Sequence, residues 1–400
     1  MPSNKDPRTI SEVGGEAGMR YALVNCDIYT GENVLYDRAI VVDGPRIESL
    51  PEIDKVPKNL DVYDLKGDSI APGFIDIQAN GGGGKLFTDE PTGDCVFAMH
   101  EAHKHFGTTN FLPTLISTSY EKMIQAIDTI KSLMTDGKFG VLGLHLEGPY
   151  INEGKGGAHD KRHIRRISNE EIDSLLKRGK DTIKIFTIAP EVVEESYIKR
   201  MKDHGIIVAI GHTNATYEQA VQSFRSGVSL VTHLFNAMSQ LTSREPGVVG
   251  AALNHDETYA GIIVDGFHVD FACVAICKKI KGHKLLLVTD AMPPVGSTMS
   301  AFKLGELDVI CSDGKCVTKD GVLAGSALDM ATAVRNCVQK IGIPLPEALR
   351  MASTYPAELL GLGNELGKIK TDYIANMVLF DYHLNVKGIV TNGEYEDFAK

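Results

Sequence analysis

The sequence predicts an α/β fold, a (β/α)8 TIM-like barrel joined to a small β domain that both ends of the chain form. Three observations lead to this prediction: eight short apolar runs between about residues 70 and 290, helix-like segments between them, and β-rich segments before and after. Continuous apolar runs are typical of strands buried on both faces, as in a parallel sheet. Eight such strands alternating with helices over roughly 250 residues match the size of a (β/α)8 barrel.

The predicted barrel strands follow one another along the chain as Phe74–Gln78, Thr109–Leu115, Val141–Leu146, Ile183–Ile188, Ile206–Gly211, Leu230–His233, Gly261–Val264 and Leu285–Thr289. Two of the helix-like segments between them are Glu195–His204 and Thr216–Ser226. Gly205 and Gly227 follow these segments, where a helix end favours a residue with positive φ.

The β-rich segments outside the barrel run from about Tyr21 to Leu65 and from about Leu366 onward. Because they flank the barrel, we expect them to pair into one domain. The predicted organisation is a poorly ordered N-terminus over 1–18, the first part of the β domain over 19–70, the barrel over 71–365 and the second part of the β domain over 366–400.

Composition excludes several classes of protein. With 52 acidic and 41 basic residues the net charge is -11, which argues against binding nucleic acid or an anionic membrane but not against a small anionic substrate. No apolar run reaches the roughly 18 residues that span a bilayer, and the first residues lack the apolar core of a secretory signal. We therefore expect a cytoplasmic protein. The seven cysteines include no CxxC pair and are expected to be buried, reduced thiols, with Cys273 and Cys277 on one helix face.

Polar residues gather at the predicted carboxyl ends of the strands, where barrel enzymes place their chemistry. They are Gln78 and Asn80 after the first strand, His145 and Glu147 at the third, His212 at the fifth, His233 at the sixth and Asp290 at the eighth. Each alone is weak evidence, since a histidine there can be structural and an aspartate can cap the next helix. Together, one carboxylate and two imidazoles that leave a position for water form a common catalytic zinc shell. A further carboxylate can then act as the base.

The motifs PGFID, HLEGP, GHT, THLFNAM, REPG, DGFHV, TDAM and LAGS, in this order, resemble the N-acetylglucosamine-6-phosphate deacetylases of the amidohydrolase superfamily. The resemblance covers about residues 20 to 395 and implies a barrel with a small β-sandwich made from both termini. It also implies hydrolysis of the N-acetyl amide of a phosphorylated amino sugar, amino sugar recycling as its setting, and a homodimer.

Residue roles follow from the resemblance, motif by motif. Glu147, His212 and His233 match the metal ligands, Asp290 matches the catalytic acid and base, and His159 looks like the residue that assists the acetyl carbonyl. Expected sugar-phosphate contacts and neighbours are Asn236, Ala237, Arg244 and His268, with Leu323, Ala324 and Gly325 as a loop that closes over the sugar and Ala158 at the mouth of the site. The alternative for Arg244 is a surface salt bridge, for example with Glu245.

Many amidohydrolases carry HxH after the first strand and hold a second metal with it, whereas this chain has Gln78 and Asn80. Amide side chains compete poorly with imidazole for zinc. We therefore expect one divalent ion per subunit, zinc first, with Fe²⁺, Mn²⁺ or Co²⁺ as alternatives. Whether Gln78 and Asn80 contact substrate or only make strand-end hydrogen bonds stays open, as does the role of His145.

Two other functions compete with this interpretation. Deaminases and cyclic-amide hydrolases of the superfamily usually have HxH and a bridging lysine after the fourth strand, but here that strand ends in Ile188-Ala189-Pro190. A barrel that had lost catalysis and served as a scaffold should lack a ligand or the base, yet Glu147, His212, His233 and Asp290 are all present.

Overall fold

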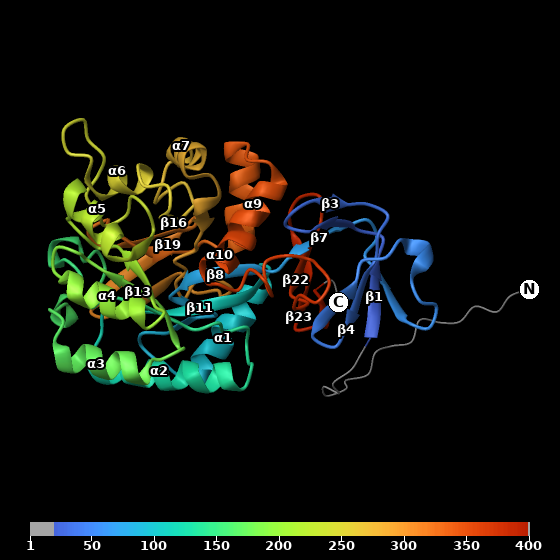
Figure 1. Cartoon of the computed structure of the whole chain (residues 1–400), viewed down its shortest axis with the longest axis horizontal. Coiled ribbons are helices and arrows are strands. Elements are labelled where there is room, and N and C mark those ends of the chain that lie inside the picture. Colours follow the sequence, from blue (N-terminus) through green and yellow to red (C-terminus); the bar gives the residue numbers. More distant parts are fainter. Residues whose placement is uncertain (1–19, 399–400) are drawn as a thin grey trace, which may run out of the picture.

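The computed structural model describes residues 20–398, so the expectation of a poorly ordered 1–18 segment lies outside the described residues. A helix-covered barrel lies beside a smaller β domain, in which segments from the beginning and the end of the chain lie side by side (Figure 1). The predicted fold class is confirmed.

The barrel strands pair in parallel in chain order, each with the next. Their bounds are β8 Phe74–Ala79, β11 Thr108–Ile116, β12 Leu144–Glu147, β13 Ile183–Ile188, β14 Ile207–Ile210, β15 Val228–Val231, β16 Tyr259–Ile262 and β17 Leu285–Leu287. The segment after β17 closes the ring against β8, because the backbone N–H of Asp290 donates to the carbonyl of Gln78 at 2.9 Å. All eight predicted strands are present. The fifth, β14, ends before His212, and the sixth, β15, ends before His233.

Helices cover the outside of the barrel and pack their apolar sides on the strands (Figure 1). They are α1 Gly93–Lys104, α2 Tyr120–Thr135, α3 Asn169–Arg178, α4 Glu195–Asp203, α5 Tyr217–Ser226, α6 Gly247–Leu253, α7 Phe271–Lys281, α8 Met330–Asn336, α9 Leu345–Ala352 and α10 Thr354–Leu359. The two helices expected from the sequence are α4 and α5. Thr216 and Gln219 form a capping box at the start of α5, and Gly227 ends it with a φ of 125°.

The β domain consists of two sheets with the strand orders β5-β4-β1-β6 and β24-β23-β22-β7-β2-β3. Its strands are β1 Arg20–Val24, β2 Asp27–Tyr29, β3 Val34–Leu35, β4 Ile40–Asp43, β5 Arg46–Ser49, β6 Asp61–Asp64, β7 Ser69–Pro72, β22 Met377–Phe380, β23 Val386–Thr391 and β24 Glu394–Asp397. One buried cluster joins Leu23 and Ile40 from the beginning of the chain to Met377 and Val390 from its end. This shared core explains why neither terminal segment forms a domain alone.

An antiparallel sheet that the sequence analysis did not predict follows β17. It comprises β18 Ala301–Leu304, β19 Leu307–Ser312, β20 Lys315–Thr318 and β21 Leu323–Ser326, and a smaller two-stranded ribbon, β9 Gly81–Gly82 with β10 Lys85–Leu86, follows β8. Asp313 and Gly314 both have positive φ in the β19–β20 turn. An Asp-Gly pair between β-rich runs is a strong hairpin signal, so this hairpin was readable from sequence.

The expectation that the cysteines are all reduced thiols is wrong for one pair. Cys311 and Cys316 face each other across β19 and β20 and form a disulfide. The hairpin brings them together, and a search for CxxC spacing could not find a pair that is five residues apart. The other five cysteines are free, and Cys273 and Cys277 both lie on α7 as expected.

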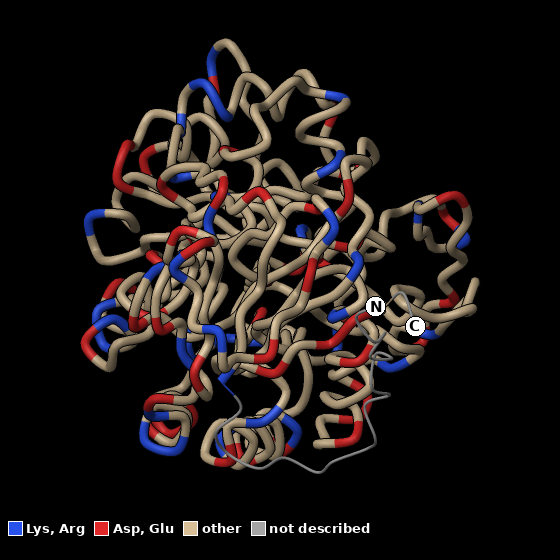
Figure 2. The backbone as a smooth tube through the Cα atoms, turned by 90° about the vertical axis from the view of Figure 1, so that its right-hand side faces the viewer, with Lys and Arg blue, Asp and Glu red and all other residues tan. Residues whose placement is uncertain are grey.

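Acidic and basic residues are interspersed along the backbone in most parts of the described chain (Figure 2). No helix within residues 20–398 is long and apolar enough to cross a membrane.

Candidate active site

A cavity of about 450 Å³ opens at the carboxyl ends of the barrel strands. This volume suits a small molecule. The side chains that line it come from several strand ends and from the β18–β21 sheet: Asn80, Ile116, Glu147, Gly154, Lys155, Gly157, Ala158, His159, His212, His233, Asn236, Ala237, His268, Asp290, Met292, Leu304, Gly321, Val322, Leu323 and Gly325. Eleven of the thirteen site residues expected from the sequence are in this set; Arg244 and Ala324 are not.

Glu147, His212 and His233 converge in the floor of the cavity. Glu147 Oε1 lies 3.0 Å from His212 Nε2 and 2.9 Å from His233 Nε2, and these two nitrogens are 3.1 Å apart. All three side chains are buried. Burial by itself would raise the pKa of Glu147, but the two imidazoles hold it well below its ordinary value. The cluster therefore presents an ionised carboxylate and two imidazole nitrogens at one point.

The hydrogen bonds of His212 fit this cluster to a divalent cation. Its Nδ1 lies 2.9 Å from the carbonyl oxygen of Lys155, an acceptor, so Nδ1 carries the proton of the neutral ring. Nε2 then directs a lone pair at Glu147 Oε1, which is also an acceptor. Two acceptors this close repel each other unless they share a cation. A backbone carbonyl that holds the other ring nitrogen is also the usual support of a metal-ligating histidine.

His159 has the opposite tautomer. The backbone N–H of Ser117 donates to its Nδ1 at 3.3 Å, and Ser117 Oγ is 2.8 Å from the same atom. Nδ1 is therefore an acceptor, and the proton of the neutral ring is on Nε2. Burial and the neighbouring His212 lower the pKa of His159 well below its ordinary value, so it stays neutral. Its ligand atom lies within 4.8 Å of those of Glu147 and His212. A protonated Nε2, however, makes it a hydrogen-bond donor rather than a ligand.

Asp290 lies beside the cluster and is held by two amides. Asn80 Nδ2 donates to Asp290 Oδ1 at 2.6 Å, and Gln78 Nε2 donates to the same oxygen at 3.2 Å and to Glu147 Oε2 at 3.1 Å. Burial, with the charge of Glu147, raises the pKa of Asp290 to about 6. A carboxyl group near neutrality can both accept and return a proton. Gln78 thus joins the two carboxylates, and Asn80 holds that of Asp290, at the carboxyl end of the first barrel strand.

His145 lies beneath this floor and does not line the cavity. Its Nδ1 is 3.0 Å from the carbonyl of Ile77, and its Nε2 is 2.8 Å from Thr187 Oγ1. Burial lowers its pKa to about 4. Both ring nitrogens of the neutral side chain are occupied, so His145 supports the strands and has no free lone pair for a metal.

The roof of the cavity comes from the β18–β21 sheet. Leu323, Ala324 and Gly325 were expected to form a loop, but they belong to strand β21. Because side chains alternate along a strand, Leu323 and Gly325 face the cavity, while Ala324 packs with Met292 and Val309 in a separate buried cluster. Ala158 packs against that cluster and also lines the cavity.

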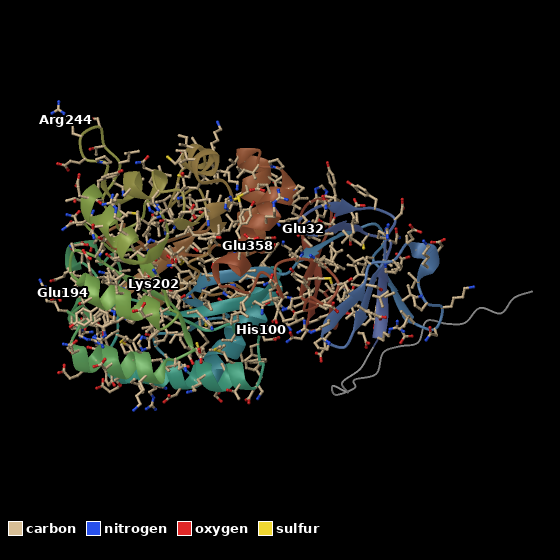
Figure 3. The ribbon with its side chains drawn as sticks, in the orientation of Figure 1. Glu32, His100, Glu194, Lys202, Arg244 and Glu358 are labelled. Carbon is tan, nitrogen blue, oxygen red and sulfur yellow. A yellow bond between two sulfur atoms is a disulfide. The ribbon has the colours of Figure 1, made fainter. Side chains whose placement is uncertain are left out.

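Arg244 does not reach the cavity of its own chain. It is exposed on the segment that precedes α6, and its side chain points away from the molecule (Figure 3). No ion pair joins it to Glu245 or to any other residue within 20–398, so the expected alternative of a surface salt bridge is not observed either.

Three residues at this site were missed from the sequence. Among residues 20–398, Lys155 is the one Lys or Arg that lines the cavity, and its Nζ lies 3.4 Å from the carbonyl oxygen of Met238. Ser117 positions His159, and Asp265 contacts His268 Nδ1 at 2.6 Å. Lys155 lies in the GKGGAH stretch that also contains His159, and Asp265 is the first residue of the DGFHV motif. Both residues could therefore have been identified from the sequence. Ser117 gave no such signal.

The backbone at the site is unusual. His212, His233 and Asp290 follow their strands directly and have φ values of 47°, 29° and 53°. Residues other than glycine rarely adopt this left-handed region, and it recurs at functional sites. The turn redirects each side chain from the strand into the cavity.

Comparison with known proteins agrees with this geometry. Residues 69–400 match the amidohydrolase family and residues 20–70 match the NagA composite domain, so the chain belongs to the amidohydrolase family, whose members are metal-dependent. More particularly, it is 39% identical to an N-acetylglucosamine-6-phosphate deacetylase from Haemophilus influenzae over 95% of this chain and 100% of the relative. A crystal structure of N-acetylglucosamine-6-phosphate deacetylase from Pasteurella multocida has a TM-score of 0.92 at 42% identity, covering 94% of this chain and 100% of that one. An N-acetylgalactosamine-6-phosphate deacetylase from a Shewanella species is 39% identical over 83% of this chain and 84% of the relative.

Proposed function

We propose that this protein hydrolyses the N-acetyl amide of N-acetyl-D-glucosamine 6-phosphate to D-glucosamine 6-phosphate and acetate, in amino sugar breakdown in the cytoplasm. The observation that carries the proposal is the convergence of Glu147, His212 and His233 beside Asp290 in one cavity. The similarity of this chain to a deacetylase of this substrate, over 95% of the chain and 100% of the relative, supports the choice of amide.

Glu147, His212 and His233 would hold one divalent ion, and zinc suits a shell of one carboxylate and two imidazoles best. When bound, such an ion supplies an acidified water and an electrophile for the acetyl oxygen. Fe²⁺, Mn²⁺ and Co²⁺ are compatible with the same ligands. Gln78 already donates to both neighbouring carboxylates, which supports one ion rather than two.

The chain's own residues divide the work as follows. Asp290 Oδ1 is fixed by Asn80 and Gln78, so the carboxylate is positioned to take a proton from the attacking water. The Nε2–H of His159 would donate to the acetyl oxygen as negative charge develops on it. Asp290 then returns the proton to the sugar nitrogen, because an amide nitrogen leaves poorly as an anion. Asn236, Ala237, Lys155 and His268 would hold the sugar phosphate, and Leu323 and Gly325 would cover the sugar.

We also propose that the active form is a homodimer in which Arg244 of one subunit reaches the phosphate in its partner's cavity. The exposed, outward position of Arg244 and the lack of any arginine in the cavity lining support this. Mixing Arg244→Ala with Asp290→Asn tests it, since a hybrid dimer contains one site with both residues. Mixed and re-associated subunits should recover activity that neither variant has, and an unchanged sum of the two activities would contradict an exchanged arginine.

The first test of the function is release of acetate and free amine from N-acetylglucosamine 6-phosphate, beside unphosphorylated N-acetylglucosamine and N-acetylgalactosamine 6-phosphate, with metal content measured on the same sample. We expect turnover of the phosphorylated gluco sugar and about one metal per chain. Faster turnover of the galacto sugar would move the substrate to that of the Shewanella relative. No turnover of any of them by metal-loaded protein would overturn the substrate class.

A further inference from the structure

Asp265 and His268 form a buried pair at the wall of the cavity. Asp265 Oδ2 lies 2.6 Å from His268 Nδ1, and the two side chains are 5% and 6% exposed. His268 lines the cavity, and no atom of residues 20–398 makes a hydrogen bond with its Nε2. Asp265 thus holds Nδ1 of the imidazole, while Nε2 remains available to a ligand in the cavity.

Asp265 has the hydrogen bonds of an ionised carboxylate. Its Oδ1 accepts the backbone N–H groups of Phe267 and His268, both at 2.8 Å, and its Oδ2 meets the imidazole. Burial would raise the pKa of Asp265, but His268 and these N–H groups bring it below its ordinary value. A fixed negative charge therefore stands behind the histidine.

A carboxylate in contact with one ring nitrogen favours the imidazolium form of histidine, in which both nitrogens donate. Asp290, which also lines the cavity, has a Coulombic interaction with His268, and a negative charge there attracts a cation. A neutral His268 with its proton on Nδ1 would offer phosphate only a lone pair, which repels it. The pair therefore decides whether this wall of the cavity attracts or repels an anion.

We infer that Asp265 is a specificity-determining residue that holds His268 as a cationic donor for the phosphate of the substrate. The inference rests on the proposed function for the identity of the substrate, but the binding of an anion at His268 does not depend on hydrolysis. Asp265 acts through His268 and is a positioning residue.

The experiment compares zinc-loaded parent protein with Asp265→Asn and with Asp270→Asn, a matched change five residues along the chain. Asp270 caps α7 with a hydrogen bond to the N–H of Ala272 and does not line the cavity. An Asn at 265 can keep the backbone hydrogen bonds but removes the charge. Since hydrogen bonds to ionised groups are roughly twice as strong as neutral ones, Asp265→Asn should raise the KM of the phosphorylated sugar and the inhibition constant of inorganic phosphate about tenfold. It should leave kcat within about twofold and kcat/KM for the unphosphorylated sugar unchanged, and Asp270→Asn should change none of these.

A double-mutant cycle with His268→Gln separates this role from a structural one. If Asp265 acts through His268, adding Asp265→Asn to His268→Gln weakens phosphate binding no further. Equal losses for phosphorylated and unphosphorylated sugar, or additive losses in the cycle, would overturn the inference. Phosphate binding measured by calorimetry keeps the test separate from catalysis: if the parent protein hydrolyses neither sugar, the proposed function fails, while weaker phosphate binding by Asp265→Asn still supports the inference.

Discussion

The two halves of the cavity are built from different parts of the chain. In the half that we propose to bind the metal, called the metal-binding half below, Glu147 ends β12, while His212, His233 and Asp290 follow β14, β15 and β17 within three residues or fewer. In the half that we propose to bind the sugar, called the sugar-binding half below, the lining comes mainly from the loop around Lys155, the turn at His268 and strand β21, with Asn236 and Ala237 from the segment after β15. The proposed metal ligands and Asp290 thus lie at strand ends, whereas His159 and most of the proposed recognition groups lie in longer segments that follow the strands.

This difference suggests that the two halves control different kinetic constants. Side chains at adjacent ends of parallel strands keep fixed spacings, as general acid-base catalysis requires. The β18–β21 sheet is less enclosed, with Ile310 and Val322 about half exposed. Changes on the metal-binding half should therefore lower kcat, and changes on the sugar-binding half should raise KM.

The largest effect should come from Asp290→Asn. It preserves the size of the side chain but removes the group that accepts and returns the proton, so kcat should fall about 10³-fold or more. Metal content, measured by elemental analysis, and binding of the phosphorylated sugar should change little. Near-normal turnover would show that Asp290 does not transfer the proton and would contradict the proposed difference between the two halves.

Lys155→Met tests the sugar-binding half. It keeps the length of the side chain and deletes the one lysine or arginine charge in the cavity lining, so the KM of the phosphorylated sugar should rise about tenfold, with kcat little changed. Steady-state kinetics on phosphorylated and unphosphorylated sugar give the result. An equal rise in both KM values would mean that Lys155 does not contact the phosphate.

Ser117→Ala tests the catalytic role of His159, which Ser117 holds in position. The variant loses one hydrogen bond to His159 Nδ1 but keeps the backbone N–H that fixes the tautomer, so kcat should fall roughly threefold to tenfold. Ser119→Ala is the control: it removes the cap of α2 and lowers the thermal midpoint without a change in kcat. An unchanged kcat for Ser117→Ala would argue against a donor role for His159.

The smallest kinetic effect should come from Cys311→Ser with Cys316→Ser. The disulfide closes a short loop and neither cysteine lines the cavity, so kcat and KM should stay within about twofold, while the free energy of unfolding of this sheet falls by about 2 kcal/mol. Thiol titration of the unfolded, unreduced parent should find five free thiols. Seven would show that the disulfide is absent.

Sequence patterns predicted the barrel strands well and pointed to residues that lie together in the cavity, because a buried parallel strand is a continuous apolar run and its end is marked by the first polar residues. Glu147, His212 and Asp290 follow this rule. The roles given to those residues stay predictions. Most of the expected sugar contacts also line the cavity, but contacts between distant segments, such as Ser117 with His159, could not be predicted from the sequence. The sequence motif of Arg244 could suggest a phosphate contact, but only the fold places that side chain outside its own cavity.

The left-handed backbone at His212, His233 and Asp290 has a consequence for stability. Each such residue costs of order 1 kcal/mol or more of folding free energy, which the rest of the barrel must offset. Glycine adopts this conformation without strain, so replacing any of the three with glycine should relieve the backbone cost while it removes the functional side chain. A gain in thermal stability in such a variant, measured beside its turnover, would show how much folding free energy the site costs the barrel.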